Sequence, residues 1–205
     1  MATFSSIIAQ QLQIGGTQMS ASNTLTGNAQ ESYAATLAAA VAAVLTARDG
    51  DTSGTITFPD QDHGFTTGDV VTLSWLESGV RKSRTDVATV VSEDEMAISG
   101  GDGDDLPTQD DPITVAIQSD LGGMFDGDDL VAIAATASRD ATVVFYDDAD
   151  AVLLKQELYA GNAWSWQSGQ GTTTPITGNA VARIAIGNRS TSGTATFRLG
   201  LLQNV

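Results

Sequence analysis

The sequence contains no cysteine, and this absence excludes several chemistries at once. Without thiols the chain has no disulfide framework, no thiolate metal site and no cysteine nucleophile. Basic residues are also scarce, because 9 Lys and Arg stand against 25 Asp and Glu, a net charge of −16. Phosphate backbones and anionic membrane surfaces are bound through Lys and Arg. We therefore expect neither nucleic acid nor a membrane among the partners.

Targeting segments are lacking too. The amino terminus, MATFSSIIAQQLQ, has neither the basic residues nor the long apolar stretch of a signal peptide. The most apolar stretch, residues 33–47, is rich in alanine and short for a membrane span. We expect a soluble protein that is made without export.

The composition that remains favours strands and turns. Charged residues make up only 17% of the chain, while Gly, Thr, Ser and Val are plentiful. Thr and Val suit pleated, half-buried surfaces, and Gly and Asp suit the turns between strands. Six strand candidates lie between residues 130 and 203, separated by short polar connections. The fold class predicted is all-β, an antiparallel β-sandwich of jelly-roll-like type.

Five further short strand candidates between residues 55 and 118 predict a small β-barrel inserted into the sandwich. Charge separates this segment from the rest of the chain. Residues 49–112 hold 15 acidic and 3 basic residues, a net of −12, and the other 141 residues carry a net of −4. The domains predicted are a discontinuous sandwich of residues 1–49 and 119–205, and an inserted acidic barrel of residues 50–118. The amino-terminal segment is expected to pair into the sandwich.

Residues 31–48 support two interpretations. Tyr33, Leu37 and Val41 have helical spacing, and alanine is the best helix former. The alternate positions from 33 to 47 also give the inner face of a strand. Local propensity favours a helix and the β context favours a strand, so both remain open.

His63, the only histidine, lies in the segment HGFTTGDVVTLSW. A catalytic histidine needs a nucleophile, an orienting acid or a metal with further ligands. The chain offers no cysteine and no second histidine, and Ser74 falls inside a strand pattern. Gly64 and Gly68 suit a turn instead. We interpret this segment as a corner that leads into a strand, and we assign no catalytic residue and no cofactor.

The aspartate clusters resemble fragments of calcium loops, in which carboxylates alternate with glycine. None contains a complete EF-hand pattern, and Asp and Gly also form ordinary hairpin turns. We therefore assign no metal site. If calcium did bind, its ligands would be Asp102, Asp104, Asp105, Asp126, Asp128 and Asp129.

Tyr159, Trp164 and Trp166 are the aromatic residues of the segment LYAGNAWSWQSG. Exposed together on one strand face, the two tryptophans would form a platform for sugar stacking. Buried, they would close the sandwich core or a subunit interface, where Trp and Tyr are enriched. We favour core or interface and name these three residues as interface candidates.

Three segments resemble known proteins. HGFTTGDVVTLSW, with the strands and acidic turn that follow, resembles the small barrel in the first catalytic cysteine half-domain of ubiquitin-activating enzymes, versions of which occur in tailed-phage virion proteins. The ubiquitin chemistry does not carry over, because the chain has no cysteine. AVARIAIGNRSTSGTATFRLGLLQNV and MSASNTLTGNAQ resemble segments of small β-sandwich virion proteins of tailed phages.

The resemblance implies a non-enzymatic virion structural protein that is assembled in the host cytoplasm. Capsid decoration or cementing is the specific role we expect, with other virion proteins as partners and a homo-oligomeric state. A tail or head-to-tail connector component is one alternative. A carbohydrate-binding module is a second alternative, and a hydrolase with paired carboxylates is a third.

Overall fold

The computed structural model describes residues 4–14, 17–27, 29–59, 62–122, 125–167, 176 and 180–204. Within these residues the protein is all-β and every strand pairing is antiparallel, as predicted. The only helical element there is a single 3₁₀ turn, η1 (Gly127–Asp129). None of the described helical segments has the length and apolar character needed to cross a membrane.

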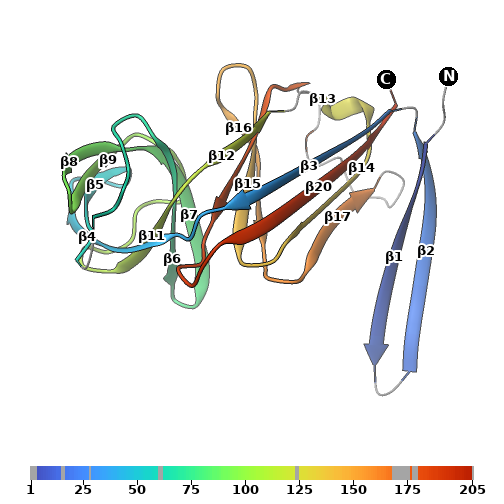
Figure 1. Cartoon of the computed structure of the whole chain (residues 1–205), viewed down its shortest axis with the longest axis horizontal. Helices are drawn as coiled ribbons and strands as arrows, with labels where there is room; N and C mark the ends of the chain where they lie inside the picture. The colour runs from blue at the N-terminus through green and yellow to red at the C-terminus, as the bar shows by residue number, and fades with distance from the viewer. Residues whose placement is uncertain are drawn as a thin grey trace.

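Two four-stranded sheets form a β-sandwich (Figure 1). One sheet has the order β17 (Ala163–Gln167), β14 (Leu130–Ala137), β20 (Ala195–Gln203) and β3 (Ala29–Leu37). The other has the order β12 (Ser119–Gly122), β19 (Arg183–Asn188), β15 (Ala141–Tyr146) and β16 (Val152–Leu158). A short pair, β13 (Phe125–Asp126) and β18 (Ala180–Val181), adds to them. Each of the six strand candidates predicted between residues 130 and 203 is a strand here.

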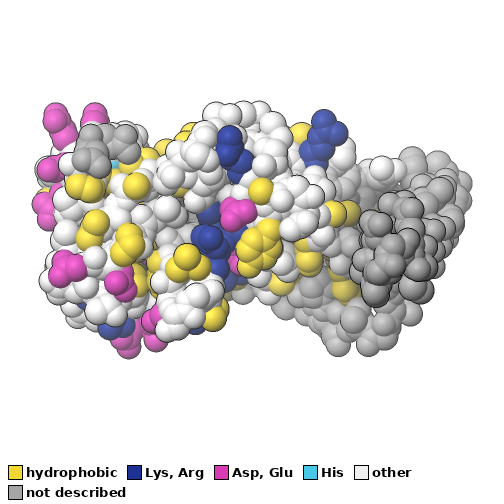
Figure 2. All heavy atoms as spheres, turned by 90° about the horizontal axis from the view of Figure 1, so that it is seen from below, with side chains coloured by type: hydrophobic (Ala, Val, Ile, Leu, Met, Phe, Trp, Pro, Cys, Tyr) yellow, Lys and Arg dark blue, Asp and Glu magenta, His cyan; other side chains and the backbone are white. Residues whose placement is uncertain are grey.

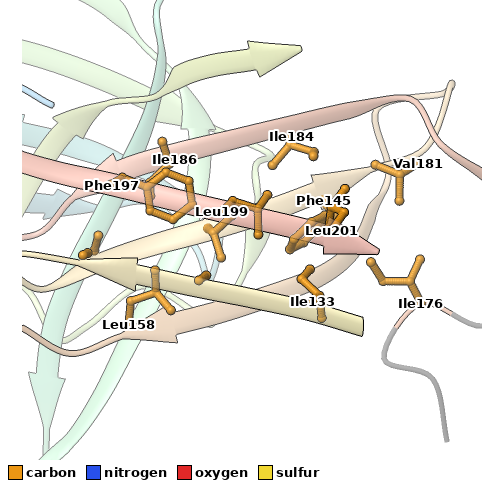
Figure 3. Close-up of a cluster of buried hydrophobic side chains, with 14 of the residues drawn as sticks. Ile133, Phe145, Leu158, Ile176, Val181, Ile184, Ile186, Phe197, Leu199 and Leu201 are labelled. Atoms are coloured by element: carbon orange, nitrogen blue, oxygen red, sulfur yellow. The ribbon is translucent and has the colours of Figure 1, made fainter. Parts of the chain in front are cut away.

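The sandwich core lies between its two sheets (Figure 3). Alternate residues of each strand point inward, because successive side chains of a strand leave opposite faces. Phe145, Ile186 and Phe197 are almost fully buried there. Ile133 and Leu199, which share a sheet with Phe197, face Phe145 and Ile186 of the other sheet. This core confirms the predicted antiparallel sandwich.

A second body is formed by one eight-stranded sheet with its own apolar core around Leu45, Ile56 and Leu73. No pairing joins its two end strands within the described chain, so the closed barrel stays a prediction. We call it the acidic body. Its strands, in spatial order, are β10 (Asp102–Gly103), β7 (Val80–Val87), β6 (Val70–Glu77), β11 (Pro112–Ile117), β4 (Val41–Arg48), β5 (Ser53–Thr57), β9 (Glu95–Ser99) and β8 (Thr89–Ser92).

The chain enters the acidic body earlier than residue 50. β3 belongs to the sandwich, but β4 pairs with β5 and β11, so the change of sheet falls at residues 38–40. The predicted membership of residues 41–48 in the sandwich is therefore corrected. The return to the sandwich falls at residue 118, between β11 and β12. The division into two folding domains remains a proposal.

Residues 31–48 form strands, which decides between the two interpretations left open above. β3 pairs along its whole length with β20, and Leu37 at its end is buried in the sandwich core. β4 lies between two partners and buries Ala43 and Leu45. Pairing on these edges outweighs the helix propensity of alanine, which is a weak preference.

The amino terminus departs from the prediction. β1 (Phe4–Ile14) and β2 (Thr17–Gly27) pair with each other and with no other described strand. They form a long two-stranded ribbon that leaves the sandwich near the start of β3 and the end of β20 (Figure 1). The expectation that the whole amino-terminal segment pairs into the sandwich is therefore wrong for β1 and β2 and holds only for β3.

Candidate functional site

His63 is buried at the corner before β6, with 6% of its surface exposed. Its Nδ1 accepts the Phe65 backbone N–H at 2.9 Å, so the ring proton lies on Nε2, which is 3.1 Å from the Ser92 carbonyl oxygen. The ring also packs against Phe58 and Phe65. Both nitrogens are engaged in holding the corner, in agreement with the structural interpretation of this segment.

The six aspartates considered for calcium do not converge. No group of three or more His, Cys, Asp or Glu side chains within the described ranges is placed to hold a metal ion. Asp126 accepts the Asp128 backbone N–H at 2.9 Å and so caps η1. Asp104 forms ion pairs with two lysines. Asp104 and Asp126 therefore have structural partners of their own.

The three aromatic candidates do not share one exposed face. Trp164 and Trp166 lie opposite two core residues of β14, and both are half-buried against the sandwich core. Tyr159 is 50% exposed, and the guanidinium of Arg189 lies 5.4 Å from the centre of its ring. The tryptophans therefore pack along an edge of the core rather than standing out together in solvent. The interface role of the three residues stays a prediction.

A polar seam, which no sequence pattern indicated, joins the acidic body to the sandwich. Glu157 on β16 is its centre. Its carboxylate accepts hydrogen bonds from the hydroxyls of Ser83 on β7 at 2.6 Å and Thr142 on β15 at 3.0 Å. The Arg189 guanidinium, whose side chain is 0% exposed, lies 2.9 Å from the same carboxylate. Burial lowers the pKa of Arg189, while the charge of Glu157 opposes that shift.

Asp104 forms the second part of the seam. Lys155 of the sandwich lies 3.0 Å from one carboxylate oxygen, and Lys82 of the acidic body lies 3.3 Å from the other. Lys155 also donates to the Ser83 carbonyl at 2.6 Å, and the Ser83 N–H donates to Asp104 at 2.9 Å. Burial acts to raise the pKa of Asp104, but these hydrogen bonds and the Lys155 charge outweigh it, so the pKa lies below its ordinary value.

The third part of the seam is uncharged. The Tyr146 hydroxyl of the sandwich donates to Gln118 at 3.1 Å, and the Gln118 amide donates to Thr72 and Thr85 of the acidic body. Close approach requires glycine at position 187, because a Cβ there would lie 2.7 Å from the Thr72 hydroxyl. The seam comprises Thr72, Lys82, Ser83, Thr85, Asp104, Gln118, Thr142, Tyr146, Lys155, Glu157, Gly187 and Arg189.

The chemistry of the seam is that of a structural connection between the acidic body and the sandwich. Its two carboxylates, those of Asp104 and Glu157, are each engaged by cationic groups and by hydroxyl or amide donors, so each has fixed partners on both bodies. The basic run Arg81, Lys82 and Arg84 inside an otherwise acidic segment was the available sequence signal. Sequence spacing alone could not show that these residues face β16.

Arg84 stabilises the acidic body itself. Its side chain is 1% exposed, and it pairs with Asp86, which is fully buried, at 3.3 Å. It also donates to the carbonyls of Gly101 at 2.8 Å and Asp104 at 2.9 Å. One buried guanidinium thus holds the acidic loop after β9 against β7.

The outer face of the β3–β20–β14 sheet differs from the rest of the surface by carrying almost no charge. Inward positions of these strands fill the sandwich core, so the alternate positions face away from it. We call this surface the outer sheet face. Its exposed residues, among which Arg198 is the one charged member, are Gln30, Ser32, Ala34, Thr36, Thr136, Thr196 and Arg198.

Figure 2 shows how charge is distributed over one side of the molecule. Acidic side chains gather over the acidic body, and basic and acidic side chains lie together in the middle, where the two bodies meet.

Comparison with known proteins gives weak results. No family model matches the chain, and no curated protein matches it. Among solved structures, VP17, a capsid protein of bacteriophage P23-77, is 10% identical over 100% of this chain and 98% of that chain, with a TM-score of 0.23. The complex of VP16 and VP17, the two major capsid proteins of that phage, gives 9% identity over 98% and 99%, also with a TM-score of 0.23.

Both neighbours are capsid proteins of the same phage. A TM-score of 0.23 carries no argument about fold or function, so the virion role is taken up below as a proposal. The resemblance of residues 63–75 to the barrel of ubiquitin-activating enzymes stays a prediction from the sequence.

Proposed function

We propose that the protein is a non-enzymatic structural subunit of a tailed-phage virion, and specifically a decoration or cement protein of the capsid. The observation that carries the proposal is the separation of charge between two joined β bodies. Residues 49–112, in the acidic body, carry a net charge of −12, whereas the outer sheet face carries one charged residue. A subunit that docks through one end and faces solvent with the other has this distribution.

The physical basis is desolvation. Burying a charge in an interface is costly unless it is paired, so docking favours the outer sheet face of the sandwich, which carries one charged residue. The acidic body, facing outward, would keep particles dispersed by mutual repulsion. The polar seam supports the same role, because it ties the outward body to the docking body through several charge-assisted bonds.

Partners under this proposal are other virion subunits, with the major capsid protein foremost, and the virion is the site of action. Tyr159, half-exposed beside the seam, and the edge tryptophans Trp164 and Trp166 remain the aromatic candidates for that contact. A position in the tail or at the head-to-tail junction is the closest alternative, since it uses the same docking arrangement.

The test is mass spectrometry of purified particles of the phage that encodes the chain, with copy number measured against the major capsid protein. A copy number near that of the major capsid protein is the expected result. A few copies per particle would place the protein in the tail or neck and refute decoration. Absence from particles would overturn the structural proposal altogether.

A further inference from the structure

Most of the basic side chains are already neutralised by carboxylates of the same chain. All 9 Lys and Arg lie among the described residues, and seven of them take part in an ion pair with an aspartate or glutamate. Arg139 and Arg198 are the two that form no ion pair within the described chain. Because the chain has 25 acidic residues, a shortage of carboxylates does not explain why these two arginines are unpaired.

Arg198 stands on the outer sheet face among small, uncharged groups. Its neighbours across the sheet are Ala34 of β3 and Thr136 of β14, and both are exposed. Gly200 lies two residues further along the same face of β20 and leaves open space where a Cβ would stand. A shallow hollow is lined by these residues. The guanidinium is therefore accessible to a group on another protein.

The exposed part of this face is limited to one end of the sheet. Towards the other end Ala132 and Leu202 are buried, and β2 approaches β14 and β20 of its own chain. Thr136 and Thr196, which lie beside Arg198, are exposed. A docking surface on this sheet therefore lies at the end where β14 finishes and β20 begins.

Arg139 lies at that same end, in the turn between β14 and β15. Its Nε donates to the Thr194 carbonyl at 3.2 Å and its Nη1 to the Ser192 hydroxyl at 2.8 Å. Both acceptors are neutral, so these bonds fix the position of the guanidinium without cancelling its charge. The adjacent Asp140 is engaged elsewhere, because its carboxylate lies 3.8 Å from Arg81.

The two arginines occupy one region of the surface. The Ser138 N–H donates to the Thr196 carbonyl at 2.9 Å, which places Arg139 beside the first residues of β20. Arg198 follows Thr194, which binds Arg139, by four residues, about 13 Å along a strand. We call Arg139, Arg198 and the small residues Ser138 and Thr196 between them the arginine corner.

We propose that the arginine corner binds carboxylates on the virion subunit to which the protein docks. An arginine without an internal partner keeps its charge available for an ion pair across an interface, and guanidinium–carboxylate pairs combine charge with a fixed geometry. The inference rests on the proposed function, in which the outer sheet face docks, and it names the chemistry of the surface that this face meets. Carboxylate is favoured over nucleic-acid phosphate, because two cations do not offset the repulsion between a polyphosphate and a chain of net charge −16.

Binding of the purified chain to particles of a phage mutant that lacks it tests the proposal. Arg198→Gln and Arg139→Gln each remove one positive charge from the arginine corner and keep a hydrogen-bond donor. Arg48→Gln is the matched control, because it removes the same charge from a surface arginine of the acidic body that already has a partner. Circular dichroism and thermal unfolding of each variant check that the fold is retained.

We expect each variant of the arginine corner to bind particles about tenfold more weakly, and the double variant about a hundredfold, because close charge pairs across an interface are strongly coupled. Arg48→Gln should bind like the unmodified chain. Added salt should weaken the binding of the unmodified chain more than that of the double variant, because salt screens ion pairs that only the unmodified chain can form.

The outcomes separate this inference from the proposed function. If the double variant binds particles as tightly as the unmodified chain, the inference is overturned and the proposed function stands. If the unmodified chain does not bind particles, both are overturned. Two further results would also overturn the inference. Self-association of the unmodified chain that Arg198→Gln abolishes would identify a second copy as the partner, and displacement from particles by duplex DNA would identify phosphate as the ligand.

Discussion

The buried pair of Glu157 and Arg189 offers the sharpest test of the seam. Glu157→Gln keeps the size of the side chain and can still accept hydrogen bonds, but it removes the charge that faces Arg189 at 2.9 Å. Removing one partner of a buried ion pair costs about 3–5 kcal/mol, because the other charge is left uncompensated. Glu157 is 22% exposed and Arg189 still donates to the Leu158 carbonyl, so we expect the lower end, about 3 kcal/mol.

The assay is urea unfolding followed by tryptophan fluorescence and circular dichroism. With a slope of about 2–3 kcal/mol per molar urea, a loss of about 3 kcal/mol lowers the midpoint by roughly 1–1.5 M. Asp51→Asn is the control, since it breaks a pair with Arg48 whose side chains are 73% and 34% exposed. Exposed pairs contribute less than about 1 kcal/mol, so the control should leave the midpoint nearly unchanged.

A free energy of unfolding for Glu157→Gln within about 0.5 kcal/mol of the unmodified chain would show that the pair contributes little, and so would an equal loss for Asp51→Asn. A double variant separates the pair from its surroundings. Glu157→Leu combined with Arg189→Met removes both charges, and apolar replacement of a whole buried pair is often neutral. We therefore expect the double variant to be more stable than Glu157→Gln.

Two further predictions concern other parts of the molecule. Arg84→Met should lower the free energy of unfolding in urea by about 3–5 kcal/mol, because it leaves the buried Asp86 carboxylate and main-chain carbonyls without their cationic partner. Arg48→Met at the surface should lower it by less than about 1 kcal/mol. Equal losses for the two variants would contradict the role given to burial. Burial and the hydrogen bond to Glu31 raise the pKa of Tyr33 from 10.0 to about 12. Its contribution to stability is therefore complete below pH 10 and lost as pH rises through 12, and absorbance titration should show a late phenolate step that Tyr33→Phe removes.

The sheet-forming segments were predictable where alternation and turn residues agreed. The first of the six strand candidates between residues 130 and 203, LVAIAATA, is β14, Leu130–Ala137. EMAIS, Glu95–Ser99, is likewise β9. In such segments the local pattern and the tertiary pairing favour the same structure, so the local preference and the fold agree.

Residues 31–48 show where local pattern fails. Alanine at almost every second position is compatible with both a helix and a strand, so the local sequence does not distinguish between them. The decision comes from β20 and from β5 and β11, which offer unpaired backbone groups along their edges. Local propensity does not indicate which other strand will supply the hydrogen-bonding partners.

The candidate sites divide in the same way. The corner role of His63 followed from what the chain lacks, and its ring nitrogens are indeed occupied at the corner. The polar seam did not follow from the sequence, because Ser83 and Glu157 are separated by 74 residues and nothing local marks either one. The half-buried position of Trp164 and Trp166 also required the edge strand to be placed.

The sequence by itself determined the class of the protein: all-β, free of thiol chemistry, and acidic in one segment. These properties depend on composition and on the alternation of apolar and polar residues, and both are the same however the strands are arranged. Only the tertiary structure decided which strands share a sheet, that β1 and β2 stand apart from it, and that Glu157, Arg189 and Asp104 join the two bodies. Those features arise from contacts between distant segments, where the free energy of burial and pairing outweighs any local preference.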